Sequence, residues 1–126
     1  MKVLIIGGTG VISTHVRRLV EQQKNEVTVI NRGRKAIELD SKTHYIKADV
    51  NDIECLKEVI DKYYFDTAID FVSFSSLDIL NRYKLLKGKI GQFVFISSAT
   101  VYNVRTGVVT ENSPIGNVFN EYAKKR

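Results

Sequence analysis

The sequence has 126 residues, 44% of them hydrophobic, and a single cysteine, Cys55. This length suffices for one compact core and is too short for two ordinary domains, so we expect one domain over residues 1–126. A lone cysteine excludes an internal disulfide and a cysteine-cluster metal site, and it favours a reducing, cytoplasmic location. The apolar run Val3–Ile6 is too short for a signal peptide or a membrane span, so no membrane association is expected.

The formal net charge of +5 and the pI of about 9.4 raise the question of an anionic partner. Basic clusters occur at 32–35, 84–89 and 124–126, without the interleaved aromatic residues that stack on bases. We interpret this charge as solvated surface plus a contribution to phosphate binding, and nucleic acid is not the expected partner.

Apolar runs of strand length alternate with segments of helical period, which predicts βαβ units around a parallel sheet. The expected strands are Val3–Ile6, Val27–Ile30, Tyr45–Ala48, Thr67–Val72 and Phe93–Ile96. Short right-handed connections favour a doubly wound sheet of order 3-2-1-4-5 with helices on both faces, an α/β Rossmann fold in three αβα layers. Such sheets commonly have about six strands, so this version is expected to be truncated.

Three helices are expected between these strands. Their ranges are about Val11–Lys24, Asp52–Lys62 and Leu77–Leu86. The first presents one apolar stripe of Ile12, Val16, Leu19 and Val20. Either Asn51 or Asp52 caps the second. Residues 99–116 are rich in turn formers and predict a loop, and a last helix begins at about residue 118.

The glycine-rich turn Gly7–Ser13 joins the first strand directly to the first helix, the context that a dinucleotide-binding motif requires. Gly7 allows the sharp turn, Gly10 lets a pyrophosphate approach the backbone, and the amides at the helix start donate to its oxygens. Ser13 replaces the usual third glycine, whose role is close helix-to-strand packing. The predicted contacts are Gly7, Thr9, Gly10, Val11 and Ile12. A tight βα connection without a ligand is the alternative.

The second strand ends at Asn31 and Arg32, where an NAD site usually carries an acidic residue against the ribose 2′-hydroxyl. A guanidinium at this point pairs instead with a 2′-phosphate, with Arg34 or Lys35 as helpers. We therefore favour NADP over NAD as the cofactor, and assign Asn31 and Arg32 to its binding. The alternative is that Arg32 is a solvated loop residue.

Several motifs together resemble the extended short-chain dehydrogenase/reductase superfamily, in particular its NAD-dependent epimerase/dehydratase group. Met1–Gly33 has the Gly-x-x-Gly-x-x-Ser turn and ends in Asn-Arg-Gly. Phe95–Tyr102 is similar to the fifth-strand motif of sugar nucleotide epimerases, and Thr110, Glu111 and Pro114 follow at the spacing seen there. The resemblance covers nearly the whole chain, but only the N-terminal portion of a family member.

The resemblance implies further cofactor contacts. Asp49 would contact the adenine amino group and Val50 would line the adenine pocket, while Phe71, Val72 and Ser73 would pass the nicotinamide ribose. Alternatives remain open for each residue. Asp49 could be a turn or helix-capping acid, and the other three could be core and turn residues.

The resemblance also implies two catalytic residues. Ser98 matches the hydroxyl that hydrogen-bonds the reacting substrate oxygen, and Tyr122 matches the tyrosine that exchanges a proton with it. The family has a lysine four residues after the tyrosine, where this sequence has Arg126. Either the chain is a non-catalytic branch or Lys125 substitutes for that lysine.

As a whole, the resemblance implies an NAD(P)-dependent epimerase/dehydratase-like or reductase-like oxidoreductase acting on a nucleotide sugar. Its C-terminal substrate-binding portion is absent, so the fragment is expected to be inactive, and the full-length protein is expected to be a homodimer if it follows the family. A non-catalytic RNA-binding protein and an NADP sensor of the same fold are the alternatives. His15 and His44 are expected on solvated faces, and no metal site is expected.

Overall fold

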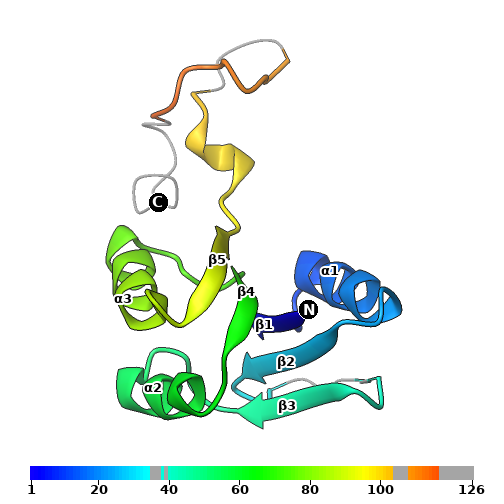
Figure 1. The fold of residues 1–126 in the computed structure, drawn as a ribbon. Helices are drawn as coiled ribbons and strands as arrows, with labels where there is room; N and C mark the ends of the chain where they lie inside the picture. The colour runs from blue at the N-terminus through cyan, green and yellow to red at the C-terminus, as the bar shows by residue number, and fades with distance from the viewer. Residues whose placement is uncertain (35–37, 39, 104–107, 117–126) are drawn as a thin grey trace.

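A computed structural model of the chain describes residues 1–34, 38, 40–103 and 108–116. Its centre is a five-stranded parallel sheet in the order β3-β2-β1-β4-β5, which confirms the predicted fold class and topology (Figure 1). The strands are β1 (Lys2–Ile6), β2 (Glu26–Asn31), β3 (Thr43–Lys47), β4 (Phe65–Asp70) and β5 (Ile90–Phe95). The apolar runs form the central strands because both faces of a doubly wound sheet are covered.

The helices connect successive strands, and Figure 1 shows α1 on one side of the sheet and α2 and α3 on the other. Their bounds are α1 (Val11–Gln22), α2 (Ile53–Lys62) and α3 (Ser76–Leu86). Asp52 caps α2, since its side chain accepts from the amide of Cys55 at 3.1 Å. This bond decides between the two capping residues that the sequence left open.

Two hydrophobic clusters fill the faces of the sheet unequally. The larger one includes Leu4, Ile30, Leu56, Ile60 and Leu86 and joins the sheet to α2 and α3. The smaller one has Val3, Ile5, Val27 and Val29 as its buried members, with Val20 of α1 packed against them. Most of the apolar burial therefore lies under α2 and α3.

The buried face of α1 differs from the predicted stripe. Ile12 and Leu19 are 64% and 56% exposed, whereas Ser13 and Arg17 are each 2% exposed. Arg17 can be buried because its guanidinium pairs with Glu21, one turn further along the helix, at 2.7 Å. The small side chain of Ser13 lets the start of the helix lie directly on the preceding turn. The predicted stripe was therefore wrong at Ile12 and Leu19, while Val20 packs against the smaller cluster as expected. Apolar spacing alone missed Arg17, whose charge is neutralised within the helix.

The carboxyl end of β4 also differs from the prediction. The strand ends at Asp70 rather than at Val72, so residues 71–73 form the turn that leaves the sheet. Beyond β5 the chain extends away from the sheet (Figure 1), with a 3-10 turn at Ala99–Val101 and one antiparallel bridge between Tyr102 and Ile115. Among the residues that the structure describes, no helix has the length and apolarity to cross a bilayer.

Candidate functional site

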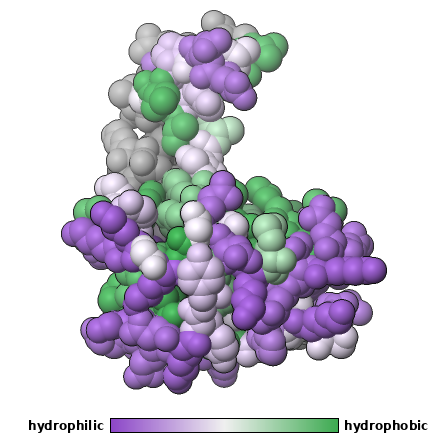
Figure 2. Space-filling model, viewed as in Figure 1, coloured by the Kyte–Doolittle hydropathy of each residue, from purple (hydrophilic) through white to green (hydrophobic). Residues whose placement is uncertain are grey.

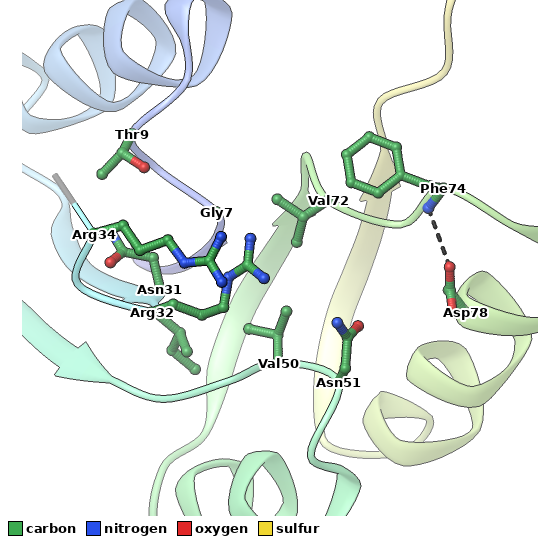
Figure 3. A pocket seen from close by; sticks show the side chains of 11 residues that line it. Gly7, Thr9, Asn31, Arg32, Arg34, Val50, Asn51, Val72, Phe74 and Asp78 are labelled. Atoms are coloured by element: carbon green, nitrogen blue, oxygen red, sulfur yellow. Dashed lines mark hydrogen bonds between the residues drawn. The ribbon is translucent and has the colours of Figure 1, made fainter. Parts of the chain in front are cut away.

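A pocket of about 490 Å³ opens where the parallel strands end, next to the turn after β1 (Figure 3). A cavity of this size suits a small organic ligand. Its lining comes from four separate chain segments: Gly7, Thr9, Ile30, Asn31, Arg32, Arg34, Val50, Asn51, Val72, Phe74 and Asp78. The pocket therefore brings together six residues that the sequence assigns to cofactor binding: Gly7, Thr9, Asn31, Arg32, Val50 and Val72.

Polar and apolar side chains occupy different parts of the molecular surface. Figure 2 shows hydrophilic side chains over the lower part of the molecule, including α2 and the β3 edge, and apolar ones toward the end from which the chain extends. Val11, Ile12 and Phe74 are exposed by 83%, 64% and 50%. Exposed apolar side chains beside a pocket are a common property of ligand sites.

Gly7 closes the inner end of the pocket with a backbone conformation suited to glycine. Its φ is +97°, and its amide donates to the carbonyl of Ile30 at 2.9 Å. A Cβ at this position would lie 2.3 Å from Cγ1 of Val72, which lines the same pocket. Backbone strain and crowding thus both require glycine here.

Ser13 fastens the glycine-rich turn to the start of α1. Its hydroxyl accepts from the amide of Gly10 at 2.8 Å and donates to the carbonyl of Gly7 at 3.1 Å. A serine in place of the third glycine therefore keeps the close packing and adds two bonds to the turn. Gly10, Val11 and Ile12 are solvent-exposed and lie outside the pocket lining. The amides of Val11 and Ile12 belong to the first helical turn, where backbone donors lack intrahelical partners.

Asn31 at the end of β2 is 8% exposed and has an incomplete set of hydrogen bonds. Its Oδ1 accepts from the amide of Gly33 at 2.7 Å and from the hydroxyl of Tyr45 at 2.6 Å. Its Nδ2 is buried without a partner among the described residues. Burying an amide NH2 group without a hydrogen-bond acceptor costs free energy, so this group is suited to donate to an oxygen or nitrogen of a ligand.

Arg32 and Arg34 place two guanidinium groups on the same side of the pocket, extending into the opening between Gly7 and Val50 (Figure 3). Both residues are exposed, so their charges are available to a ligand phosphate. The amides at the start of α1, the unpaired donor of Asn31 and the two guanidinium groups together suit an anionic ligand such as a dinucleotide. Lys35 lies outside the described residues.

Besides Gly10, Val11 and Ile12, three more residues that the sequence assigns to the cofactor do not line the pocket. The carboxylate of Asp49 accepts from the amide of Asn51 at 3.0 Å, which is the geometry of a turn acid. Phe71 packs against the smaller hydrophobic cluster. Ser73 is fully buried, and its hydroxyl donates to Asp70 at 2.6 Å. Their contacts with a cofactor stay predictions.

A buried ion pair behind the pocket was not predicted from the sequence. Nη1 of Arg82 lies 2.8 Å from Oδ2 of Asp70, and these two side chains are 2% and 0% exposed. The same Nη1 donates to the hydroxyl of Ser73 at 3.0 Å, and Nη2 donates to Oδ1 of Asn51 at 3.3 Å. The only sequence signals were an acid in an apolar strand and a base on the inner face of a helix.

Asp78 lies at the far side of the pocket and begins α3. Its Oδ2 accepts from the amides of Phe74 and Ser75 at 3.2 and 3.0 Å, in a capping box with Ser75. Hydrogen bonding by the Ser75 side chain lowers the pKa of Asp78 most, the two amides and the charge of Arg82 lower it further, and burial opposes them. The pocket thus carries an ionised carboxylate opposite its two arginines.

Ser98 follows β5 and stands at the same edge of the sheet as the turn after β1. It is half-buried, its Oγ lies 2.9 Å from Oγ1 of Thr100, and it caps the 3-10 turn by accepting from the amide of Thr100. It does not line the pocket. Tyr122, Lys125 and Arg126 lie outside the described residues, so the catalytic assignments stay predictions.

A family model described as "NAD dependent epimerase/dehydratase family" matches residues 3–126. The chain belongs to this family. It is the dinucleotide-binding Rossmann part of a family member, and the turn, sheet order and pocket described above are arranged accordingly.

Similar proteins agree with this assignment. UDP-glucose 4-epimerase from Yersinia enterocolitica is 28% identical, with the match covering 100% of this chain and 46% of that protein. The crystal structure of UDP-glucose 4-epimerase from Bifidobacterium longum in complex with NAD+ and UDP has a TM-score of 0.83 at 21% identity, over 99% of this chain and 45% of that one. The chain therefore spans about half the length of these relatives.

A relative with a different printed function also matches. The chloroplast stem-loop binding protein of 41 kDa b from Arabidopsis thaliana is 26% identical over 114 residues, which is 80% of this chain and 30% of that protein.

Proposed function

We propose that the pocket binds the adenosine half of a nicotinamide dinucleotide and that it prefers NADP to NAD. The observation that carries this proposal concerns the end of β2 and the residues just after it, where the described part of the lining has Asn31, Arg32 and Arg34 and no carboxylate. A carboxylate there would accept from the ribose 2′-hydroxyl and repel a 2′-phosphate. Two guanidinium groups and an amide donor instead favour a negatively charged 2′-phosphate.

In this assignment the glycine-rich turn holds the pyrophosphate, with the amides of Val11 and Ile12 as donors. Nδ2 of Asn31 and the side chains of Arg32 and Arg34 hold the adenosine ribose and its 2′-phosphate. Val50 and Val72 supply apolar walls for the base and the adjoining sugar. The bound group would supply hydride transfer, and the protein's part is to bind and orient it.

Calorimetric titration of the protein with NADP+ and with NAD+ tests the cofactor proposal. We expect tighter binding of NADP+, and we expect Arg32→Glu to weaken it by about tenfold to a hundredfold, the loss expected for one charge-assisted bond. Arg18→Glu is the matched control, because Arg18 is an exposed arginine of α1 that does not line the pocket. Equal or tighter binding of NAD+ by the unmodified protein would refute the preference.

For the complete polypeptide we propose a reaction on a nucleotide sugar, as the names of the UDP-glucose 4-epimerase relatives indicate. Ser98 would donate to the substrate oxygen at which charge develops, and Tyr122 would exchange the proton. Ser98→Ala should then lower kcat with UDP-glucose by about a hundredfold while KM changes little. An unchanged kcat would remove Ser98 from the reaction.

RNA binding is a second candidate, favoured by the match to the chloroplast stem-loop binding protein. Fluorescence anisotropy with a stem-loop RNA tests it. If RNA is a ligand, its affinity should fall steeply between about 50 and 200 mM salt, because phosphate contacts release counterions. Binding that is undetectable at the lower salt concentration would exclude this candidate.

A further inference from the structure

The buried ion pair between Arg82 and Asp70 reaches the pocket through one side chain, Asn51. We propose that Arg82 orients the side-chain amide of Asn51 so that its NH2 group donates a hydrogen bond to the adenosine half of a bound dinucleotide. Asn51 is then a binding residue and Arg82 a positioning residue. This inference rests on the proposed cofactor site and adds to it a contact on the base side.

The chemistry of arginine determines which way the amide points. A guanidinium has donors and no acceptor, so the atom of Asn51 that faces Nη2 of Arg82 at 3.3 Å has to be the oxygen. The amide nitrogen then points the other way. Figure 3 shows this nitrogen on the side of Val72 and the oxygen on the side of Asp78. Asn51 thus presents a donor to the pocket.

Arg82 can act in this way because its own position is fixed. Nη1 donates to both carboxylate oxygens of Asp70, at 3.0 and 2.8 Å, and to the hydroxyl of Ser73. Asp70 in turn accepts from the amides of Val72 and Ser73 at 2.8 and 3.0 Å. The pair therefore connects α3, the turn after β4 and the turn after β3. Two of the residues it holds, Val72 and Asn51, line the pocket.

The position of Asn51 determines which part of the ligand it would meet. In a sheet of this order the pyrophosphate lies at the turn after β1 and the adenosine ribose at the end of β2. Asn51 follows β3, the next strand outward, so it lies beyond the ribose, on the side of the base. Adenine ring nitrogens are acceptors and match an NH2 donor.

Replacing Asn51 with aspartate tests the NH2 donor separately from the contact between the side-chain oxygen and Arg82. Asn51→Asp keeps an oxygen for Arg82 and even adds a charge to that contact, but it removes the NH2 group. We expect the Kd of ADP, a probe without nicotinamide, to rise by about threefold to tenfold, as for one lost hydrogen bond. The rise should persist at high salt, since a lost donor is not screened. An unchanged Kd would refute the donor role.

The double variant Asp70→Asn with Arg82→Met tests the positioning role. Asn at position 70 keeps acceptors for the amides of Val72 and Ser73, and Met fills the space without leaving a buried charge unpaired. The orientation of Asn51 is then lost, and we expect the Kd of ADP to rise to about the same extent as in Asn51→Asp.

The matched control is Arg17→Met with Glu21→Gln, which removes a second buried ion pair of the described residues, and neither Arg17 nor Glu21 lines the pocket. Its Kd should stay unchanged, and thermal unfolding of both double variants checks that they fold. An equal rise in the control, or no rise in the Arg82 variant, would overturn the inference. If the unmodified protein binds neither ADP nor NADP+, the proposed function itself fails, which is a separate result.

Discussion

At the scale of single residues, the contact between Gly7 and Val72 joins the phosphate-binding turn to the opposite wall of the pocket. Two effects act at Gly7: a φ of +97° and a Cβ position only 2.3 Å from Val72. Gly88, after α3, has a similar φ of +80° with nothing near its Cβ position. The two glycines therefore allow strain and crowding to be measured separately.

We expect Gly7→Ala to lower the free energy of unfolding by about 2–4 kcal/mol, the sum of backbone strain and overpacking, and to weaken dinucleotide binding. Gly88→Ala should lower it by about 1 kcal/mol, from strain alone, and leave binding unchanged. Urea denaturation and calorimetric titration measure the two effects. Equal losses of stability in the two variants would mean that the contact with Val72 does not require glycine.

At the scale of elements, the start of α3 depends on an ionised side chain. The capping box of Ser75 and Asp78 satisfies amides at the helix start, and a negative charge there also interacts favourably with the helix dipole. Because the pKa of Asp78 is lowered from its ordinary value of 3.8, its carboxylate stabilises the folded state above that value. This contribution is lost as the pH falls through 3.8 toward the lower pKa of the folded state.

Asp78→Asn should therefore be less stable than the unmodified protein at neutral pH, by about 0.5–1 kcal/mol for a cap and its charge. The difference should shrink as the pH falls below about 4, where the aspartate of the unmodified protein becomes protonated. Urea titrations across this pH range measure it. A difference that stays constant into acid would show that the charge contributes nothing to the cap.

The elements themselves could be predicted because their signals are local. Apolar runs predict β1 and β2, and the glycine-rich turn after β1 predicts both the strand before it and the helix after it. The face of α1 could not be predicted by spacing alone, since Arg17 becomes buried through a partner one turn away. The end of β4 was missed for a similar reason. Phe71 and Val72 are apolar, but the amides of Val72 and Ser73 donate to the side chain of Asp70 and so form a turn.

At the scale of the molecule, stability depends mainly on the cluster under α2 and α3. Leu86 is fully buried in that cluster, while Leu80 of the same helix is 47% exposed. We expect Leu86→Ala to lower the free energy of unfolding by about 2–5 kcal/mol, and Leu80→Ala by about 0.5 kcal/mol. Chemical denaturation compares them. A loss at Leu80 as large as that at Leu86 would indicate that this face of α3 is covered in solution.

The candidate site was predictable to the extent that it lies close in sequence to a motif. Gly7 follows β1, Asn31 ends β2 and Arg32 follows it, and the fold defines these positions. The group around Arg82 was not predictable, because its partners Asp70 and Asn51 lie 12 and 31 residues away and meet only once the sheet has formed. Neither periodicity nor residue spacing in the sequence predicts contacts between residues so far apart in the chain.

The hydrogen bond from Tyr45 to Asn31 gives the protein an optical reporter of its own site. The sequence has six tyrosines and no tryptophan, so its near-ultraviolet emission comes from phenol groups alone. The Tyr45 hydroxyl donates to an amide that lines the pocket, so a ligand that engages Asn31 should alter the emission of this phenol. Tyrosine fluorescence should therefore change on adding NADP+, and much less in Tyr45→Phe. Occupancy of the pocket can then be followed without any attached dye.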